Sequence, residues 1–376
     1  MKGFLLALFC VVCVVGASAG TLKPAAIFGV DWIDGRILPL EGRAFDDVEN
    51  YYDRLPANVS TAVCANVRAL KHDTSGLQFR FTTTSPTICL RWTPYYDHWV
   101  RRLPGCVLNG LGMAHMPVTG VSGLDIYTQR ADGRWVYLKT GDIHPGEGAC
   151  VSTGRVDVVR IPPGTPILIN LPLYNGLRSF ELGVERGSSV APLPKRRSGV
   201  EKPVVFYGTS ITQGACASRP GMAFVNIVGR ELDVPVVNLG FSGGGEMELE
   251  MSEYLSRIDA SCYVLDAIAN MNPWSEMKSR YEPFIRNLRA KRPDVPIIMA
   301  EQSNVWSVTR GDRDEYIHAL YEKLVAEGWR DLYYLPKTKM LPDQESTVDG
   351  CHPNDLGMRS LARAFGGVVK TALKLN

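Results

Sequence analysis

The sequence predicts two domains, an all-β sandwich or jelly roll followed by an α/β domain with a doubly wound parallel sheet. Three observations predict this fold class. The chain has 376 residues, which exceeds one typical domain. Apolar residues alternate with polar ones in the first half, whereas short apolar runs alternate with helical patterns in the second half. The 36 glycines and 24 prolines indicate many turns rather than a helical bundle.

Residues 1–19 have the features of a cleaved signal peptide. A charged start at Met1-Lys2-Gly3 is followed by an apolar run from Phe4 to Val15 and by a small-residue end at Ala17-Ser18-Ala19. The apolar run is shorter than the roughly 20 residues that a membrane-spanning helix needs, and no comparable run follows. We therefore expect a secreted or periplasmic protein with no integral membrane segment after signal cleavage.

Residues 20–186 are expected to form the β-sandwich. Four stretches in this range carry apolar residues at every second position, which is the period of a half-buried strand. They are Leu77-x-Phe79-x-Phe81, Ile88-x-Leu90-x-Trp92, Ile167-x-Ile169-x-Leu171-x-Leu173 and Phe180-x-Leu182-x-Val184. Turn signals at Ala131-Asp132-Gly133 and Pro162-Pro163-Gly164 suit an antiparallel sandwich or jelly roll. By fold analogy, such a domain is stable by itself and is often a binding or spacer module.

Residues 187–202 are predicted to be a surface linker, because they are polar, contain proline and lack periodicity. The basic run Lys195-Arg196-Arg197 is expected to be solvated rather than to bind a ligand. Residues 203–376 form the second domain. Its strands are expected at 204–207, 234–239, 262–269, 295–300 and 332–335, and its helices at 222–232, 246–258, 277–289, 313–327 and 356–373. This alternation predicts a parallel sheet with its site at the carboxyl ends of the strands.

Charge and cysteine content limit the function classes. A formal net charge of +2 and the absence of a long basic run give no electrostatic basis for a nucleic-acid partner. Of nine cysteines, Cys10 and Cys13 lie in the signal segment. Export permits disulfides, which we expect among the four cysteines of the N-terminal half, with the connectivity left open. These are Cys64, Cys89, Cys106 and Cys150. No CxxC pair among the seven cysteines outside the signal segment, and no histidine cluster, indicates a metal, so no metal and no organic cofactor is expected.

Ser210 and the segment Asp349-Gly350-Cys351-His352-Pro353 carry the groups of a hydrolytic triad. Ser210 follows an apolar strand in a tight turn, at the rim where such folds bind ligands. His352 can act as the base because an imidazole is partly unprotonated at neutral pH, and Asp349 can orient it. The alternative roles are a helix cap for Ser210 and a hydrogen-bonded loop histidine for His352. Their joint occurrence in this fold favours catalysis.

Two later strand ends offer donors for an oxyanion. The turn Asn238-Leu239-Gly240-Phe241-Ser242-Gly243-Gly244-Gly245 allows a backbone N–H to approach substrate, and we select Gly243. After the third strand, the Asn270 side chain can donate a hydrogen bond. The alternatives are a glycine turn that only enters the next helix and an asparagine that caps one.

These blocks, in this order, resemble those of the SGNH hydrolases, also called GDSL-type esterases. The resemblance covers roughly residues 203–374 and implies a flavodoxin-like sheet. It implies Ser210 as nucleophile, His352 as base and Asp349 as its orienting partner. The backbone amides of Ser210 and Gly243 and the side chain of Asn270 are implied as oxyanion donors. The sequence departs from the family pattern in two places. The first block reads Gly-Thr-Ser-Ile rather than Gly-Asp-Ser-Leu, and Ile268 stands two positions before Asn270, where the family usually has a glycine.

The arrangement of a sandwich before such a domain resembles two-domain carbohydrate esterases. This implies a secreted acetylesterase that deacylates a polysaccharide or oligosaccharide. Trp274, Trp306 and Arg219 are candidate substrate contacts. The alternatives are ordinary packing for the two tryptophans and an exposed position without a substrate role for Arg219. Two other functions stay open. One is a lipid or small-ester hydrolase of the platelet-activating-factor acetylhydrolase type, and the other is an inactive carbohydrate-binding protein.

Overall fold

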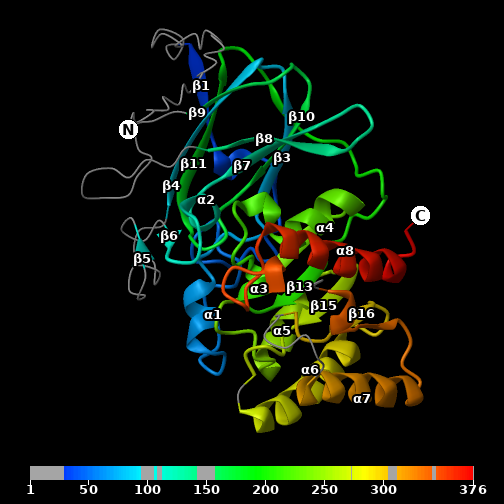
Figure 1. Cartoon of the computed structure of the whole chain (residues 1–376). Coiled ribbons are helices and arrows are strands. Elements are labelled where there is room, and N and C mark those ends of the chain that lie inside the picture. Colours follow the sequence, from blue (N-terminus) through cyan, green and yellow to red (C-terminus); the bar gives the residue numbers. More distant parts are fainter. Residues whose placement is uncertain are drawn as a thin grey trace, which may run out of the picture.

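The computed structural model of the chain describes residues 29–94, 106–107, 112–141, 157–271, 273–303, 311–340 and 344–375. The predicted signal peptide, residues 1–19, lies outside the described residues. Figure 1 shows a strand-rich layer stacked on an α/β layer. This arrangement confirms the predicted fold class.

The N-terminal half forms two antiparallel sheets that enclose a common core. The first sheet has the order β1 (Val30–Asp34), β11 (Leu177–Glu185), β4 (Thr87–Pro94), β9 (Asp157–Arg160). The second has the order β12 (Val190–Pro192), β3 (Gln78–Thr83), β10 (Pro166–Asn170), β7 (Asp125–Gln129), β8 (Trp135–Thr140), and β2 (Leu40–Glu41) also pairs with β3. The core contains Phe79, Phe81, Leu90, Trp92, Ile169 and Phe180, all from the alternating stretches. The alternation of apolar residues along the sequence therefore predicts which face of these strands is buried.

Five smaller elements complete this half. The short strands β5 (Cys106–Val107) and β6 (Gly112–Met113) pair with each other. This half also contains two short helices, α1 (Ala65–Leu70) and α2 (Val118–Val121), and a 3-10 turn at Gly35–Ile37.

The C-terminal half contains a five-stranded parallel sheet. Its order is β14 (Val236–Gly240), β13 (Val204–Gly208), β15 (Cys262–Asp266), β16 (Ile297–Ala300), β17 (Leu332–Leu335). In sequence order this is 2-1-3-4-5, the flavodoxin-like arrangement, whose switch point lies between the first and third strands. These strands are β13 and β15. Ligands in such folds bind at the carboxyl ends of the strands at this point.

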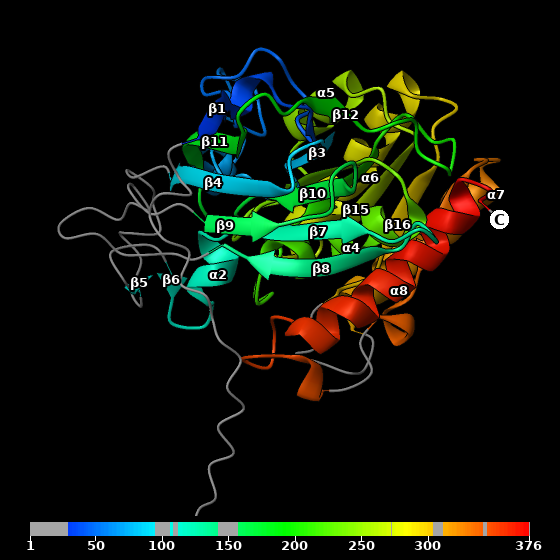
Figure 2. The ribbon, with the colours of Figure 1, turned by 90° about the horizontal axis from the view of Figure 1, so that it is seen from above.

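Helices cover both faces of the parallel sheet. One face packs against α5 (Leu249–Arg257), α6 (Trp274–Lys291) and α7 (Asp312–Ala326), and the other packs against α4 (Phe224–Leu232) and α8 (Asp355–Ala372). Short 3-10 turns span Pro220–Met222, Lys337–Lys339 and Gln344–Ser346. Figure 2 shows α8 running along one side of the molecule. Successive residues of β13 face opposite layers, since Val205 and Tyr207 join the first core and Val204 and Phe206 the second.

The predicted linker is partly wrong. Residues 190–192 form β12, an extended strand that pairs with β3 at the edge of the second sandwich sheet. The basic run is not uniformly solvated either. The Arg196 side chain is only 8% exposed and forms ion pairs with Glu41 and Asp233, which tie strand β2 of the sandwich to the end of α4.

The sandwich is also not an independent body. Phe45, Leu55, Val63, Val67 and Leu70 from the N-terminal half pack in the same core as the residues under α5 and α6. Figure 1 shows α1 beside the α/β layer rather than within the sandwich. These apolar side chains therefore pack in a core that the two domains share.

The structure contains no helix that is long and apolar enough to cross a membrane among the residues it describes.

Candidate active site

The carboxyl ends of β13, β14 and β15 lie in register. Gly208, the last residue of β13, is paired with Gly240 of β14 on one side and with Asp266 of β15 on the other. The loops after these strands therefore begin at the same level of the sheet. Ser210, Gly243 and Asn270 follow their strand ends by a few residues, and this register brings the three loops together.

Ser210 is the first residue of α3 (Ser210–Gln213), a single turn that Gly214 ends with φ +118. The short turn starts directly after a buried strand, so the Ser210 side chain faces the edge of the sheet. The Oγ atom lies 3.0 Å from Nε2 of His352. This distance is a hydrogen bond between a nucleophile and a base.

Asp349 accepts three hydrogen bonds in one tight turn, two from His352 and one from Cys351. Oδ2 lies 2.8 Å from the Nδ1 atom of His352, while Oδ1 accepts the backbone N–H groups of His352 and Cys351 at 2.7 and 3.0 Å. Gly350 takes φ +80 between them, a conformation that glycine adopts without strain. Burial opposes ionisation of the Asp349 carboxyl, but the hydrogen bonds from His352 and Cys351 outweigh it and lower its pKa to about 2.

The structure therefore brings the three predicted triad residues into one chain of contacts, carboxylate to imidazole to hydroxyl. Asp349 is ionised at neutral pH and accepts from Nδ1, so a neutral His352 carries its lone pair on Nε2. That lone pair points to the Ser210 hydroxyl. The arrangement can remove a proton from Ser210 and stabilise the imidazolium that results.

The glycine-rich loop after β14 lies against the nucleophile turn. Phe241 N–H donates to the Gly208 carbonyl at 3.0 Å, and Ser242 N–H donates to Oε1 of Gln213 at 2.8 Å. Gly243 itself takes φ +60. Within the described part of the chain, the backbone N–H groups of Ser210 and Gly243 donate to no protein acceptor, which leaves them available to a ligand.

Asn270 reaches the same loop from the end of β15. Its Nδ2 donates one hydrogen bond to the Gly244 carbonyl at 2.8 Å. An amide nitrogen carries two hydrogens, so the second remains for a ligand. The Asn270 side chain is thereby fixed against the glycine-rich loop, next to Gly243.

The N-terminal domain braces this loop with Arg54 and Asn66, two residues that sequence reasoning missed. The buried Arg54 guanidinium donates to the carbonyls of Asn238 and Gly240 at 3.1 and 2.7 Å, and Asn66 Nδ2 donates to the Gly243 carbonyl at 2.8 Å. They lie 177 to 186 residues from their partners in sequence. No local pattern in the sequence signals contacts of this range.

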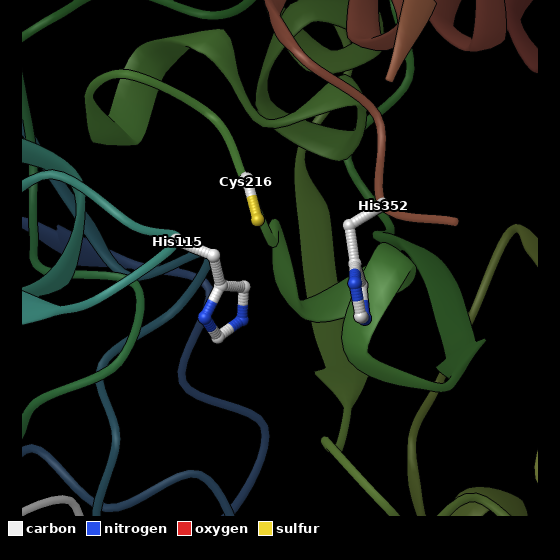
Figure 3. A group of neighbouring side chains, drawn as sticks. All are labelled: His115, Cys216 and His352. Carbon is white, nitrogen blue, oxygen red and sulfur yellow. The ribbon is translucent and has the colours of Figure 1, made fainter. Parts of the chain in front are cut away.

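His115, also missed, comes from the N-terminal domain and lies beside the triad. Its ring centroid is 5.7 Å from that of His352. Partial burial lowers the pKa of His115, and the neighbouring His352 lowers it further, so the neutral imidazole is favoured. Figure 3 shows His115, Cys216 and His352 facing one another across a small space. The N-terminal domain thus forms one wall of the site.

The buried Asp266 carboxyl forms a hydrogen bond with the turn that carries the nucleophile. Oδ2 of Asp266 accepts hydrogen bonds from Thr212 Oγ1 at 2.8 Å and from Ser303 Oγ at 3.1 Å. Burial raises the Asp266 pKa to about 7, although these two hydrogen bonds partly oppose the increase. No basic side chain pairs with this carboxyl among the described residues.

The structure describes two of the three predicted substrate contacts, Arg219 and Trp274, and both contact side chains outside the triad. Arg219 donates to the buried Asp125 at 2.6 Å and to the Tyr127 hydroxyl, so it connects the loop after α3 to strand β7 of the sandwich. Trp274 packs edge-on against Tyr316 with ring centroids 5.6 Å apart. Trp306 lies outside the described residues. Structural roles therefore account for the first two.

The predicted disulfides are not found among the cysteines whose side chains the structure describes. Cys64 and Cys89 are both free, as are Cys216, Cys262 and Cys351. Cys89 is buried in the sandwich and Cys64 lies beside the α/β core, so both pack as small apolar side chains. The other two candidates, Cys106 and Cys150, have side chains outside the described set.

Comparison with known families finds two matches that together span most of the chain. A family model described as the GDSL-like lipase/acylhydrolase family matches residues 201–370, and one described as the N-terminus of SGNH hydrolase-type esterases matches residues 30–190. The comparison with curated proteins found no match.

Three solved structures are similar over both domains. A protein from Bacteroides ovatus described as a GDSL-like lipase is 30% identical, with a TM-score of 0.77 over 92% of this chain and 99% of its own. The salicylyl-acyltransferase SsfX3 from a tetracycline biosynthetic pathway is 17% identical, with a TM-score of 0.70 over 93% and 99%. A family two carbohydrate esterase from Clostridium thermocellum, in complex with cellohexaose, is 13% identical, with a TM-score of 0.53 over 80% and 93%. The last two share the fold.

Proposed function

We propose that this chain, which belongs to the GDSL-like lipase/acylhydrolase family and is a carboxylic ester hydrolase, removes O-acyl groups, foremost O-acetyl groups, from carbohydrate. The observation that carries the proposal is the chain of contacts from Asp349 through His352 to Ser210, at 2.8 and 3.0 Å. These are the contacts that a serine esterase requires.

The proposed reaction has two steps that share one intermediate. His352 Nε2 takes the Ser210 proton while Oγ bonds to the ester carbonyl carbon. The imidazolium then returns this proton to the departing sugar oxygen as the carbon–oxygen bond breaks, which leaves an acyl group on Ser210. Water attacks the acyl-enzyme with His352 again as base, and the carboxylic acid and free serine are released.

The developing oxyanion is stabilised by the N–H groups of Ser210 and Gly243 and by the Asn270 amide. These donors are fixed before substrate arrives, because the loop that carries Gly243 is bonded to the nucleophile turn and to Asn66 of the N-terminal domain. Fixed donors need no reorganisation in the transition state, and each typically contributes about 10²–10³ in kcat. Asp349 stabilises the imidazolium.

A carbohydrate substrate is supported by the two-domain arrangement, which a carbohydrate esterase bound to cellohexaose shares. We propose that the chain acts outside the cytoplasm on an acylated polysaccharide or oligosaccharide, since its first residues have the features of a signal peptide. The net charge of +2 gives no basis for a nucleic-acid partner.

Lipid esters are the second candidate substrate class. The observation that favours them is the description of the Bacteroides ovatus protein, at 30% identity, as a GDSL-like lipase. An inactive carbohydrate-binding protein is a weaker alternative, because Ser210, His352 and Asp349 make the contacts that hydrolysis requires.

The test compares the chain with its Ser210→Ala variant. We expect hydrolysis of p-nitrophenyl acetate by the parent and none above background by the variant, and equal inactivity of both would favour the pure binding protein. The substrate class follows from the acids released. Acetate from acetylated xylan, mannan or pectin supports the proposal, whereas faster release of long fatty acids from lipid esters would replace it with the lipid function.

A further inference from the structure

Three potential metal ligands converge beside the nucleophile. One donor atom each of His115, Cys216 and His352 lies within 4.8 Å of the other two. They come from three separate segments, namely the loop between β6 and α2, the loop after α3, and the loop before α8. Figure 3 shows the three side chains pointing into the same space.

This donor set suits a borderline-soft divalent cation. Two imidazole nitrogens and one thiolate are a ligand combination that Zn²⁺ binds tetrahedrally, with a fourth position left for water. Zinc distances of about 2.0–2.3 Å place ligand atoms roughly 3.5 Å apart, so the donors need to move closer by at most about 1 Å. His115 is only partly buried and comes from a loop, so its side chain can supply this movement.

The surroundings of His352 favour metal binding through Nε2. Its Nδ1 is bonded to Asp349 at 2.8 Å, and a carboxylate on the far nitrogen is the usual partner of a metal-bound histidine. Cys216 is held in place because its backbone N–H donates to the carbonyl of Pro353 at 3.0 Å. The loop after α3 is therefore tied to the segment that carries His352.

Two other acidic clusters in the described residues lack this combination. The first group contains Glu49, Asp53 and His72. Glu49 forms an ion pair with Lys71, and Nδ1 of His72 is bonded to Asp53. In the group of Cys64, Glu246 and Glu248, Arg280 pairs with Glu246 and the Cys64 N–H is bonded to Glu248. Protein donors already neutralise or occupy these carboxylates, so neither group competes as a soft-metal site.

We propose that His115, Cys216 and His352 bind a borderline-soft divalent cation, Zn²⁺ foremost, and that the bound ion inhibits hydrolysis reversibly. On binding, the Cys216 thiol releases its proton to solvent and the thiolate bonds to the metal. Nε2 of His352 then donates its lone pair to the ion and is no longer able to accept the Ser210 proton. The inhibition rests on the proposed function, whereas the binding does not.

The binding is tested with Co²⁺ on the full chain carrying Ser210→Ala, which needs no enzymatic activity. A thiolate bonded to Co²⁺ gives a near-ultraviolet charge-transfer absorption. We expect this band with one equivalent of Co²⁺, its loss on addition of Zn²⁺, and its absence in Cys216→Ser. A band that persists in Cys216→Ser, or no band at all, would overturn the proposal.

The inhibition is tested by titrating Zn²⁺ into the active chain with p-nitrophenyl acetate, with each variant normalised to its own metal-free rate. We expect EDTA to restore activity, and Cys216→Ser or His115→Asn to raise the half-inhibiting Zn²⁺ concentration on the order of tenfold or more. Cys351→Ser is the matched control, because this thiol adjoins His352 in sequence but lies outside the cluster. Unchanged inhibition in both ligand variants, or its loss in Cys351→Ser, contradicts the site.

Discussion

Replacing Arg54 with methionine tests whether the N-terminal domain is part of the catalytic machinery. Arg54 is 1% exposed, and its guanidinium carbon lies 4.5 Å from the centroid of the Phe241 ring. It donates four hydrogen bonds to backbone carbonyls. The acceptors are Asp73 at 2.7 Å, Asn238 at 3.1 Å, Gly240 at 2.7 Å and Leu70 at 2.9 Å. Two of these belong to each domain, so the side chain joins the domains at the start of the loop that carries Gly243.

The expected loss of stability follows from these contacts. A hydrogen bond from a charged group contributes roughly 1.5–3 kcal/mol, but desolvation of the cation opposes this gain. Burial lowers the Arg54 pKa to about 10, although nearby Asp73 and Tyr174 partly offset the decrease, so the group stays charged at neutral pH. Methionine fills the space but leaves the carbonyls without a donor. We expect the free energy of unfolding to fall by about 3–5 kcal/mol.

Catalysis should fall as well, because Gly240 leads directly into the oxyanion loop. A displacement on the order of 1 Å there would reduce kcat by about 10²-fold. The assay is urea unfolding together with hydrolysis of p-nitrophenyl acetate under conditions where the variant stays folded. Arg257→Met is the matched control, since Arg257 also bridges the domains, to Asp47 at 2.8 Å, but both side chains are about half exposed. We expect it to cost less than about 1 kcal/mol and to leave kcat unchanged. Equal effects of the two substitutions would refute the reasoning.

Three further changes address the triad, the oxyanion loop and the buried carboxyl. Asp349→Asn should lower kcat by roughly 10⁴-fold, because an asparagine at this position favours the wrong His352 tautomer. A much smaller loss of kcat in steady-state kinetics would contradict this role of Asp349. Gly243→Ala places a Cβ 2.6 Å from an Asn66 nitrogen at φ +60 and should lower kcat on the order of 10²-fold, whereas the control Gly187→Ala, at φ +81 with open space around it, should lower stability alone. With an Asp266 pKa of about 7, the folded state keeps a proton that the unfolded chain releases near pH 4. The contribution of Asp266 to the free energy of unfolding is therefore fully present below pH 4 and decreases as the pH rises to about 7. Unfolding curves should show that Asp266→Asn removes this loss, on the order of 4 kcal/mol, and an unchanged pH dependence would contradict the burial argument.

The sequence was sufficient for the fold class and for the residues that meet at the triad. Strand periodicity located the sandwich core, and the alternation of strands with helices predicted the parallel sheet. Ser210 and His352 could be identified because each lies in a short segment whose turn residues are recognisable, such as Gly350. Ser210 follows the end of β13 and His352 lies in the segment between β17 and α8, so both belong to loops at the carboxyl edge of the sheet, where such folds bind ligands.

The sequence was insufficient where the two domains meet. Arg54, Asn66 and His115 act on loops of the second domain, and isolated polar residues in a β-rich segment have no periodicity that indicates such partners. The position of Arg219 on the loop after Ser210 predicts a substrate contact, but the structure pairs it with Asp125 in the sandwich. Buried polar groups need partners, and the identity of a distant partner depends on tertiary packing.

The central claim is that Ser210 is the nucleophile activated by His352. The most direct measurement is covalent labelling with a fluorophosphonate, which reacts with activated serine hydroxyls, followed by peptide mass spectrometry. We predict a single adduct on Ser210, no labelling of Ser210→Ala, and slower labelling of His352→Ala. An adduct on another serine, with hydrolysis preserved in Ser210→Ala, would contradict the claim.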